Sequence, residues 1–174
     1  METPDLEALK EAFRSGMRPE LIFFWGHTPK GDGVGKHLLS QWWPATFSIG
    51  GQTFASAEHH MMAEKAKLFG DDEMFAAILA AESPSQAKSL GRRVHGFNEE
   101  RWTAHRFPIA VRGKSAKFGQ NPVLKSWLLA TGDMVLVEAS PVDKIWGIGL
   151  AADDQRAKDP RTWPKVRQAL RAAA

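Results

Sequence analysis

Residues 45–69, ATFSIGGQTFASAEHHMMAEKAKLF, combine the two patterns that decide the fold. Apolar residues alternate on both sides of Gly50-Gly51, which is typical of a β-hairpin with a two-residue turn. Ser56 follows as a predicted helix N-cap, and we expect the helix that it begins to run to about Phe69. A hairpin that leads directly into a helix indicates an α+β protein.

The remaining sequence predicts a mostly helical α+β domain with a small β-sheet. Strands are expected at Leu21–Trp25 (LIFFW), which reads as a buried strand, and at Met134–Ala139, which ends at Ser140-Pro141. Further helices are expected from Thr3-Pro4 through Phe13, from Asp71 to Ala81, from the capping box Ser83-Pro84-Gln86 to Gly91, from Asn98 to Phe118 with Pro108 kinking or splitting it, from Asn121-Pro122 to Gly132, and from Thr162 to Ala173. No internal repeat or linker interrupts the pattern, so we expect one domain over residues 1–174.

Composition narrows the functional classes. The 174 residues, 43% hydrophobic and 25% charged, suit a single globular domain. The absence of cysteine excludes disulfides and thiolate-bound metals and is compatible with a reducing compartment. No apolar run approaches the roughly 18 residues that a membrane span needs, and the acidic start METPDLEALKEAF is unlike a signal peptide. We therefore expect a cytoplasmic enzyme or binding domain.

The basic isoelectric point, about 9.3, reflects the end of the chain. Residues 151–174 hold six Lys/Arg and three Asp/Glu, which leaves seventeen of each in residues 1–150. One internal stretch, residues 101–132, has six Lys/Arg and no acidic residue. Such a stretch is usually a solvated face, and its alternative is a surface that meets phosphate groups.

Two segments imitate known binding sites but fail their requirements. The loop Lys30–His37 (KGDGVGKH) resembles a phosphate-binding loop, yet it lacks the leading glycine and the hydroxyl residue after Gly-Lys, so we expect a surface loop. His59 and His60 stand near Glu58 and Glu64, but only His60 and Glu64 have the i, i+4 spacing of two metal ligands. No metal site and no cofactor are therefore predicted.

Glu58 and Lys65 are the first candidates for chemistry. They are seven residues apart, so on a helix they share one face with Met61 and Met62 and stand roughly 10 Å apart along the axis, about the span of a nucleoside. In a cleft, the carboxylate and the amine could serve as base and as nucleophile or electrostatic anchor. An exposed helix with unrelated charges fits the same pattern.

The segment 137–149, VEASPVDKIWGIG, is the second candidate. It places Asp143 and Trp146 in a loop after a predicted strand, with glycines that allow a ligand to approach the backbone. Tryptophan can stack on a planar base while an aspartate contacts a sugar or orients water. A core tryptophan beside a structural turn is the alternative.

Several stretches together resemble the NADAR family, which includes N-glycosidases that act on riboflavin-biosynthesis intermediates. They are FFWGH; LLSQWWPATFSIGGQTFASAEHHMMAEKAKLF; SPSQAKSLGRRV; WTAHRFPIAVRGKSAKFGQNPVLKSWLLATGDMVLVEASPVDKIWGIGL; and DPRTWP. Their order and spacing agree from about residue 21 to residue 164. The resemblance implies the family's own mostly helical fold and metal-free cleavage of an N-glycosidic bond.

The resemblance also assigns roles to positions of this chain. Glu58 matches the motif glutamate, a catalytic carboxylate; Lys65 matches a lysine proposed to attack the anomeric carbon of ribose; and Asp143 matches the acid of the second motif. The positions implied to contact substrate are Phe24, Trp42, Arg92, Arg93, Lys117 and Trp146, of which the two arginines suit a phosphate.

Three functions follow as hypotheses. The first is hydrolysis of the N-glycosidic bond of a phosphoribosylamino-pyrimidine intermediate of riboflavin synthesis. The second is removal of ADP-ribose from guanine in nucleic acid, which the acid-free stretch 101–132 and the basic tail favour slightly. The third is a non-catalytic module that binds ADP-ribose or a nucleotide. The expected partner is thus a phosphoribosyl or ADP-ribosyl substrate, with nucleic acid as a modified substrate and no membrane.

Overall fold

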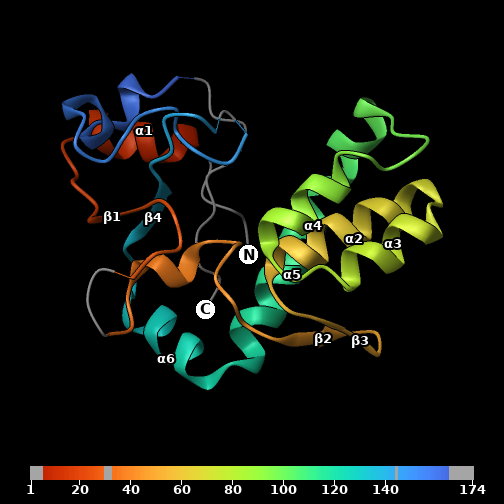
Figure 1. Ribbon diagram of the computed structural model, residues 1–174. Helices are drawn as coiled ribbons and strands as arrows, with labels where there is room; N and C mark the ends of the chain where they lie inside the picture. The colour runs from red at the N-terminus through yellow and green to blue at the C-terminus, as the bar shows by residue number, and fades with distance from the viewer. Residues whose placement is uncertain (1–5, 30–32, 144, 165–174) are drawn as a thin grey trace. The chain divides into compact units, whose positions relative to one another are not determined.

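A computed structural model describes residues 6–29, 33–143 and 145–164. The chain divides into two compact units, residues 1–40 with 127–174 and residues 41–126. Figure 1 labels the helices and strands of both. The described helices cover much more of the chain than the four strands, so the mostly helical α+β class is confirmed. None of the described helices is long and apolar enough to cross a membrane.

The first unit is built around two parallel strands. Strand β1 (Leu21–Phe24) pairs with β4 (Val135–Glu138), and Phe24 lies opposite Glu138. Helix α1 (Leu6–Arg14) buries Leu9 and Phe13 in the apolar core that β4 and the later segment also form. The same unit contains the 3-10 helices η1 (Lys36–Leu39), η2 (Gln155–Lys158) and η3 (Pro160–Thr162). Parallel strands cannot be joined by a hairpin and need a longer crossover connection. Here more than a hundred residues separate the two strands.

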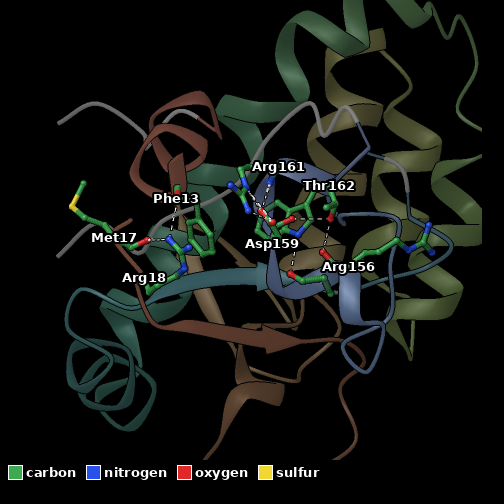
Figure 2. A network of polar contacts seen from close by, with 9 residues as sticks. Phe13, Met17, Arg18, Arg156, Asp159, Arg161 and Thr162 are labelled. Atoms are coloured by element: carbon green, nitrogen blue, oxygen red, sulfur yellow. Dashed lines mark hydrogen bonds and ion pairs between the residues drawn. The ribbon is translucent and has the colours of Figure 1, made fainter. Parts of the chain in front are cut away.

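The segment after η2 packs against α1, and polar contacts within each of these two segments fix its local conformation (Figure 2). Asp159 caps η3 and holds the guanidinium of Arg161 through both carboxylate oxygens. The hydroxyl of Thr162 donates to the carbonyl oxygens of Arg156 and Asp159. Arg18 donates to the carbonyl oxygen of Phe13, at the end of α1. These contacts hold Trp163 in the core of the unit, where its indole donates to Ala157.

The second unit is a cluster of helices with a β-hairpin. Helix α2 (Ala57–Phe69) packs against α3 (Asp72–Leu79), α4 (Pro84–Gly91) and α5 (Glu99–Gln120). The hairpin consists of β2 (Phe47–Ile49) and β3 (Gln52–Phe54). Its turn residues, Gly50 and Gly51, have φ of 58° and 81°, the left-handed conformations that the two-residue turn requires. Helix α6 (Pro122–Ala130) contains the boundary between the units.

Local capping explains why these helices begin where the sequence predicts. Side-chain oxygens of Ser56, Asp71, Ser83 and Asn98 each accept a hydrogen bond from the backbone N–H three residues on. Each bond satisfies one of the N–H groups that a helix leaves without an intrahelical partner.

Three predictions need correction. Pro108 does not split its helix, because α5 continues through it from Glu99 to Gln120. Trp25 is neither buried nor part of the strand, which ends at Phe24. The single small sheet is instead two separate two-stranded sheets. The predicted helix start at Thr3-Pro4 and residues 165–173 of the predicted last helix lie outside the described residues.

Candidate functional site

The predicted site residues fall into two groups, one in each unit. Glu58, Lys65 and Lys117 lie in the second unit with Trp42, Arg92 and Arg93. Phe24, Asp143 and Trp146 lie in the first. Each group is described on its own below.

Glu58 is a buried carboxylate in the first turn of α2. Its side chain belongs to a residue only 2% exposed, and its backbone N–H donates to the carbonyl oxygen of Gln41 at 3.0 Å. Helix α2 is buried on most of its faces. The alternative of an exposed helix with unrelated charges is therefore wrong. A carboxylate in such surroundings interacts more strongly with a developing positive charge than one in water.

The two histidines that follow Glu58 are structural. The Nε2 of His59 donates to the carbonyl oxygen of Ala81 at 3.1 Å, because a carbonyl only accepts, and Nδ1 bonds with the hydroxyl of Ser56 at 2.8 Å. His60, 1% exposed, packs against the rings of Phe47 and Phe54. No group of three potential metal ligands occurs among residues 6–29, 33–143 and 145–164.

Lys65 points toward α4 and the start of α5. Its Nζ donates to the carbonyl oxygen of Gly91 at 2.8 Å and lies 4.1 Å from the centre of the Phe97 ring and 5.7 Å from that of Trp102. Desolvation lowers the pKa of Lys65, and Glu99 opposes that shift. The amine thus holds the end of α4 against the aromatic start of α5, and a nucleophilic role would require that it leave Gly91.

Lys117 is the most deeply buried lysine of the described residues. It is 1% exposed on the last turns of α5. Burial, with a smaller contribution from Lys114, lowers the pKa of Lys117 to about 7. A lowered pKa at a buried lysine is common at functional sites, so Lys117 stays a candidate site residue.

The packing of α2 on α5 places Lys117 near the level of Glu58. Along α2, Phe69 meets Arg101, Lys65 meets Trp102, and His60 meets Gly113. These contacts run in opposite directions along the two helices. One turn beyond Gly113, Lys117 therefore lies level with the first turn of α2.

The other predicted contacts of this unit lie around α4. Arg92, the C-cap of the helix, and Arg93 are both exposed. Trp42 is half-buried, and the Nζ of Lys88 lies 5.6 Å from its ring centre.

In the first unit, the candidate residues lie at the carboxyl ends of the parallel strands. Phe24 ends β1 and is buried, 8% exposed. Its carbonyl oxygen accepts from the N–H of Ala139 at 2.8 Å, so the chains leaving β1 and β4 start side by side. The N–H of Ile148 donates to Glu138, which brings the loop 139–147 back to the strand where it began. Ligands commonly bind at such strand ends.

Asp143 organises this loop. Its Oδ1 accepts from the backbone N–H groups of Ile145 and Trp146 at 2.8 and 2.9 Å, and its own N–H donates to the buried hydroxyl of Ser140. Gly147 completes the turn, because a Cβ there would lie 2.9 Å from the carbonyl oxygen of Asp143. Trp146 is thus held in a fixed backbone position and is half-buried.

Sequence reasoning missed two features of these groups. Ser140 is a buried anchor of the loop, and the Ser-Pro pair was interpreted only as a strand end. Trp25, rather than Phe24, is the exposed ring at the end of β1, at 59% exposure. No local signal separates the two rings, because all five residues of LIFFW are apolar.

The fold is of the α+β class. The second unit has a buried carboxylate, Glu58, on a helix, and the first unit has a loop at the end of a parallel strand pair in which Asp143 holds the backbone of Trp146. The model of the NADAR domain matches residues 23–165, and the chain belongs to this family. It is 45% identical over 148 residues to "N-glycosidase R617" of Acanthamoeba polyphaga mimivirus, which covers 82% of this chain and 86% of that protein.

Two further proteins extend the comparison. The chain is 33% identical over 112 residues to "Riboflavin biosynthesis protein VVA0006" of Vibrio vulnificus, which covers 64% of this chain but only 30% of that longer protein. The solved structure of the Escherichia coli protein YbiA matches with a TM-score of 0.65 at 23% identity, over 84% of this chain and 82% of that one. The structural match confirms the fold.

Proposed function

We propose that this protein is a hydrolase that cleaves the N-glycosidic bond of phosphoribosylamino-pyrimidine intermediates of riboflavin biosynthesis. The observation that carries the proposal is the similarity to the mimivirus N-glycosidase, which extends over most of both chains. The riboflavin-biosynthesis protein among the relatives supports the substrate class. The buried carboxylate of Glu58 supports the reaction type.

The reaction exchanges one bond for another at the anomeric carbon. The bond between that carbon and the amine nitrogen breaks, a water oxygen bonds to the carbon, and a water proton goes to the leaving amine. Positive charge develops on the ribose in the transition state. In the proposal, Glu58 stabilises this charge and accepts the proton of the attacking water.

The other candidate residues receive supporting roles in the same proposal. Lys65 serves as nucleophile or electrostatic anchor, Lys117 binds substrate, and Arg92 and Arg93 bind its phosphate. Asp143 orients sugar or water through Oδ2 while Oδ1 holds the loop. Trp42, Trp146 and Phe24 complete the contacts with the substrate. No cofactor is required by this chemistry.

Base release tests the proposal. Purified wild type is incubated with a phosphoribosylamino-pyrimidine, and separately with an oligonucleotide that carries ADP-ribosylated guanine. We expect release from the first substrate, a loss of at least a hundredfold in Glu58→Gln, and wild-type rates in Glu73→Gln, an exposed glutamate of α3. Base release only from the oligonucleotide would show that ADP-ribosylated guanine is the substrate. Base release from neither substrate would favour a non-catalytic binding module.

The role of Lys65 is separated by a second variant. Borohydride reduction during turnover traps a covalent adduct if an amine attacks the anomeric carbon. An adduct in wild type that is absent from Lys65→Met supports a nucleophile at this position. Trapping that persists in Lys65→Met, with slower base release, leaves Lys65 an electrostatic role.

A further inference from the structure

We propose that Gln120 is a positioning residue of the site around Glu58 and Lys117. Its side-chain amide holds strand β2 against the last turn of α5 and so keeps the Lys117 amine in the interior, level with Glu58. This inference rests on the proposed function, which places both groups against the substrate. The observations that carry it are the hydrogen bonds of Gln120 and Asn121 and the packing of the hairpin on α2.

The amide of Gln120 completes the outer edge of β2. Its Oε1 accepts from the backbone N–H of Ser48 at 2.8 Å, and its Nε2 donates to the carbonyl oxygen of the same residue at 2.8 Å. A neighbouring antiparallel strand pairs with a residue by the same two-way exchange. The side chain therefore takes the place of a third strand and ties the hairpin to the end of α5.

Asn121, the C-cap of α5, adds a second tie. Its Nδ2 donates to the carbonyl oxygen of Lys117 at 2.7 Å and to that of Thr46, just before β2, at 3.1 Å. The carbonyl of Lys117 is one of those that the end of a helix leaves without an intrahelical partner. The backbone of Lys117 is thus linked directly to the chain that enters the hairpin.

The hairpin also packs on α2, the helix that carries Glu58. The ring centres of Phe47 and Phe54 lie 5.9 and 4.9 Å from that of His60. His60 follows Glu58 by two residues on the same helix. The hairpin therefore contacts both helices of the site, and the amide of Gln120 is one of the groups that set its place on α5.

Lys117 is the site residue that this arrangement keeps from water. It is 1% exposed and lies within one turn of Gln120 on α5, against which β2 packs. Water that reaches a buried amine favours its charged form. Loosening β2 from the end of α5 admits water there, so the protonation of Lys117 reports on the tie that Gln120 makes. The Gln120 side chain is itself exposed, so its replacement leaves the core intact.

The experiment compares Gln120→Met with Gln52→Met. Methionine has nearly the length of glutamine and lacks its amide. Gln52 is the matched control, because it lies on the same hairpin and its Nε2 donates to the carbonyl oxygen of Thr53 within that hairpin. The pKa of Lys117 is measured by NMR titration of the lysine side chains, with Lys117→Met for assignment. KM is measured for release of base from the phosphoribosylamino-pyrimidine.

In Gln120→Met we expect the pKa of Lys117 to rise from about 7 toward its ordinary 10.5. The rise should be about half a unit or more, with KM about two- to tenfold higher, which is the equilibrium effect of one or two ordinary hydrogen bonds. Gln52→Met should keep the wild-type values. A loss of overall stability alone lowers the fraction of folded protein and does not change the pKa of Lys117 within it.

The outcomes separate this inference from the proposed function. A Lys117 pKa that Gln120→Met leaves unchanged overturns the inference, even where KM rises, because Gln120 would then act on the substrate directly. An equal rise of the pKa in Gln52→Met overturns it as well, because the stability of the hairpin rather than its tie to α5 would be responsible. A pKa that rises only in Gln120→Met, in a protein that cleaves no N-glycoside, keeps the positioning of Lys117 and rejects the function.

Discussion

At the scale of single residues, burial rather than spacing decides which charged groups can do chemistry. Glu58 and Lys65 have the helical spacing expected of a pair, yet only Glu58 is nearly inaccessible, and Lys65 holds the end of α4. Lys117, which belongs to the basic stretch 101–132 and is implied by the resemblance to contact substrate, is buried. A buried amine is costly unless it is paired and hydrogen-bonded, and buried groups with shifted pKa values are common at functional sites.

This cost predicts the behaviour of Lys117→Met. The pKa of Lys117 is about 7 in the folded protein and ordinarily 10.5, so between these values the unfolded chain binds more protons. The unfolding free energy of the wild type therefore rises with pH across this window, and the cost is fully present below it. We expect Lys117→Met to lack this rise, which in the wild type amounts to no more than about 5 kcal/mol between the two pKa values.

Urea unfolding at pH 6.5, 8 and 9.5 checks this prediction, with Lys125→Met, which removes an exposed lysine, as the control. Base release is measured in parallel and should fall in Lys117→Met, since the proposal places this residue against the substrate. A rise of the same size in Lys117→Met would show that another group titrates in this window.

At the scale of elements, close approach between helices sets the geometry around Glu58. Gly113 of α5 faces the ring of His60 on α2, and a Cβ at position 113 would lie 2.4 Å from its Nδ1. The contact requires a glycine in the middle of a 22-residue helix, where glycine is otherwise unfavourable. The distance between α2, which carries Glu58, and α5 therefore depends on this glycine, and one added methyl group would change it.

Gly113→Ala is therefore expected to lower the unfolding free energy by about 1–3 kcal/mol, the usual cost of overpacking. Combining it with His60→Ala should recover part of that loss, because the methyl group then has room. Gly119→Ala, where nothing lies within 4 Å, is the control and should leave stability the same or slightly higher. Denaturant unfolding of Gly113→Ala, His60→Ala, the double variant and Gly119→Ala checks this, and strictly additive effects would show that the two residues do not meet.

Most elements could be predicted because their signals are local. The caps at Ser56, Asp71, Ser83 and Asn98 each act within three residues, and the Gly50-Gly51 turn needs only its own backbone conformation. Pro108 misled because proline costs a helix one hydrogen bond, which the packing of a long helix can outweigh.

Long-range features could not be predicted in the same way. The parallel pairing of β1 with β4 joins residues 21–24 to residues 135–138, and no local pattern specifies that partner. The candidate loop at Asp143 was found because acid, aromatic and glycine stand close in sequence. Trp25 was predicted to be buried because the apolar run LIFFW does not show where the strand ends.

At the scale of the whole molecule, the pKa values divide acid sensitivity into two windows. In the first unit, Arg161 lowers the pKa of Asp159 to about 2, so the stabilisation that this carboxylate gives is lost only as pH falls below its ordinary 3.8. In the second unit, burial, with a smaller contribution from Arg112, lowers the pKa of His60 from 6.5 to about 4. On acidification, the loss of stability that His60 causes therefore begins at a higher pH than the loss that Asp159 causes.

The sign of the His60 contribution follows from its environment. Both ring nitrogens are buried without a hydrogen-bond partner, among Phe47, Phe54 and Gly113. The folded protein keeps the ring neutral, while the unfolded chain binds a proton as pH falls through 6.5. The unfolding free energy of the wild type should therefore decrease from pH 6.5 to pH 4, by about 3 kcal/mol in total from this residue.

His60→Leu removes the titrating group and keeps an apolar side chain against the hairpin. We expect it to be more stable than wild type at pH 7, because no polar atom is left buried without a partner, and to lose the slope between pH 6.5 and pH 4. Urea unfolding at pH 7, 6, 5 and 4.5 measures both effects, and His105→Leu, at an exposed position of α5, should keep the wild-type slope. A slope that persists in His60→Leu would show that another group causes the loss of stability between pH 6.5 and pH 4.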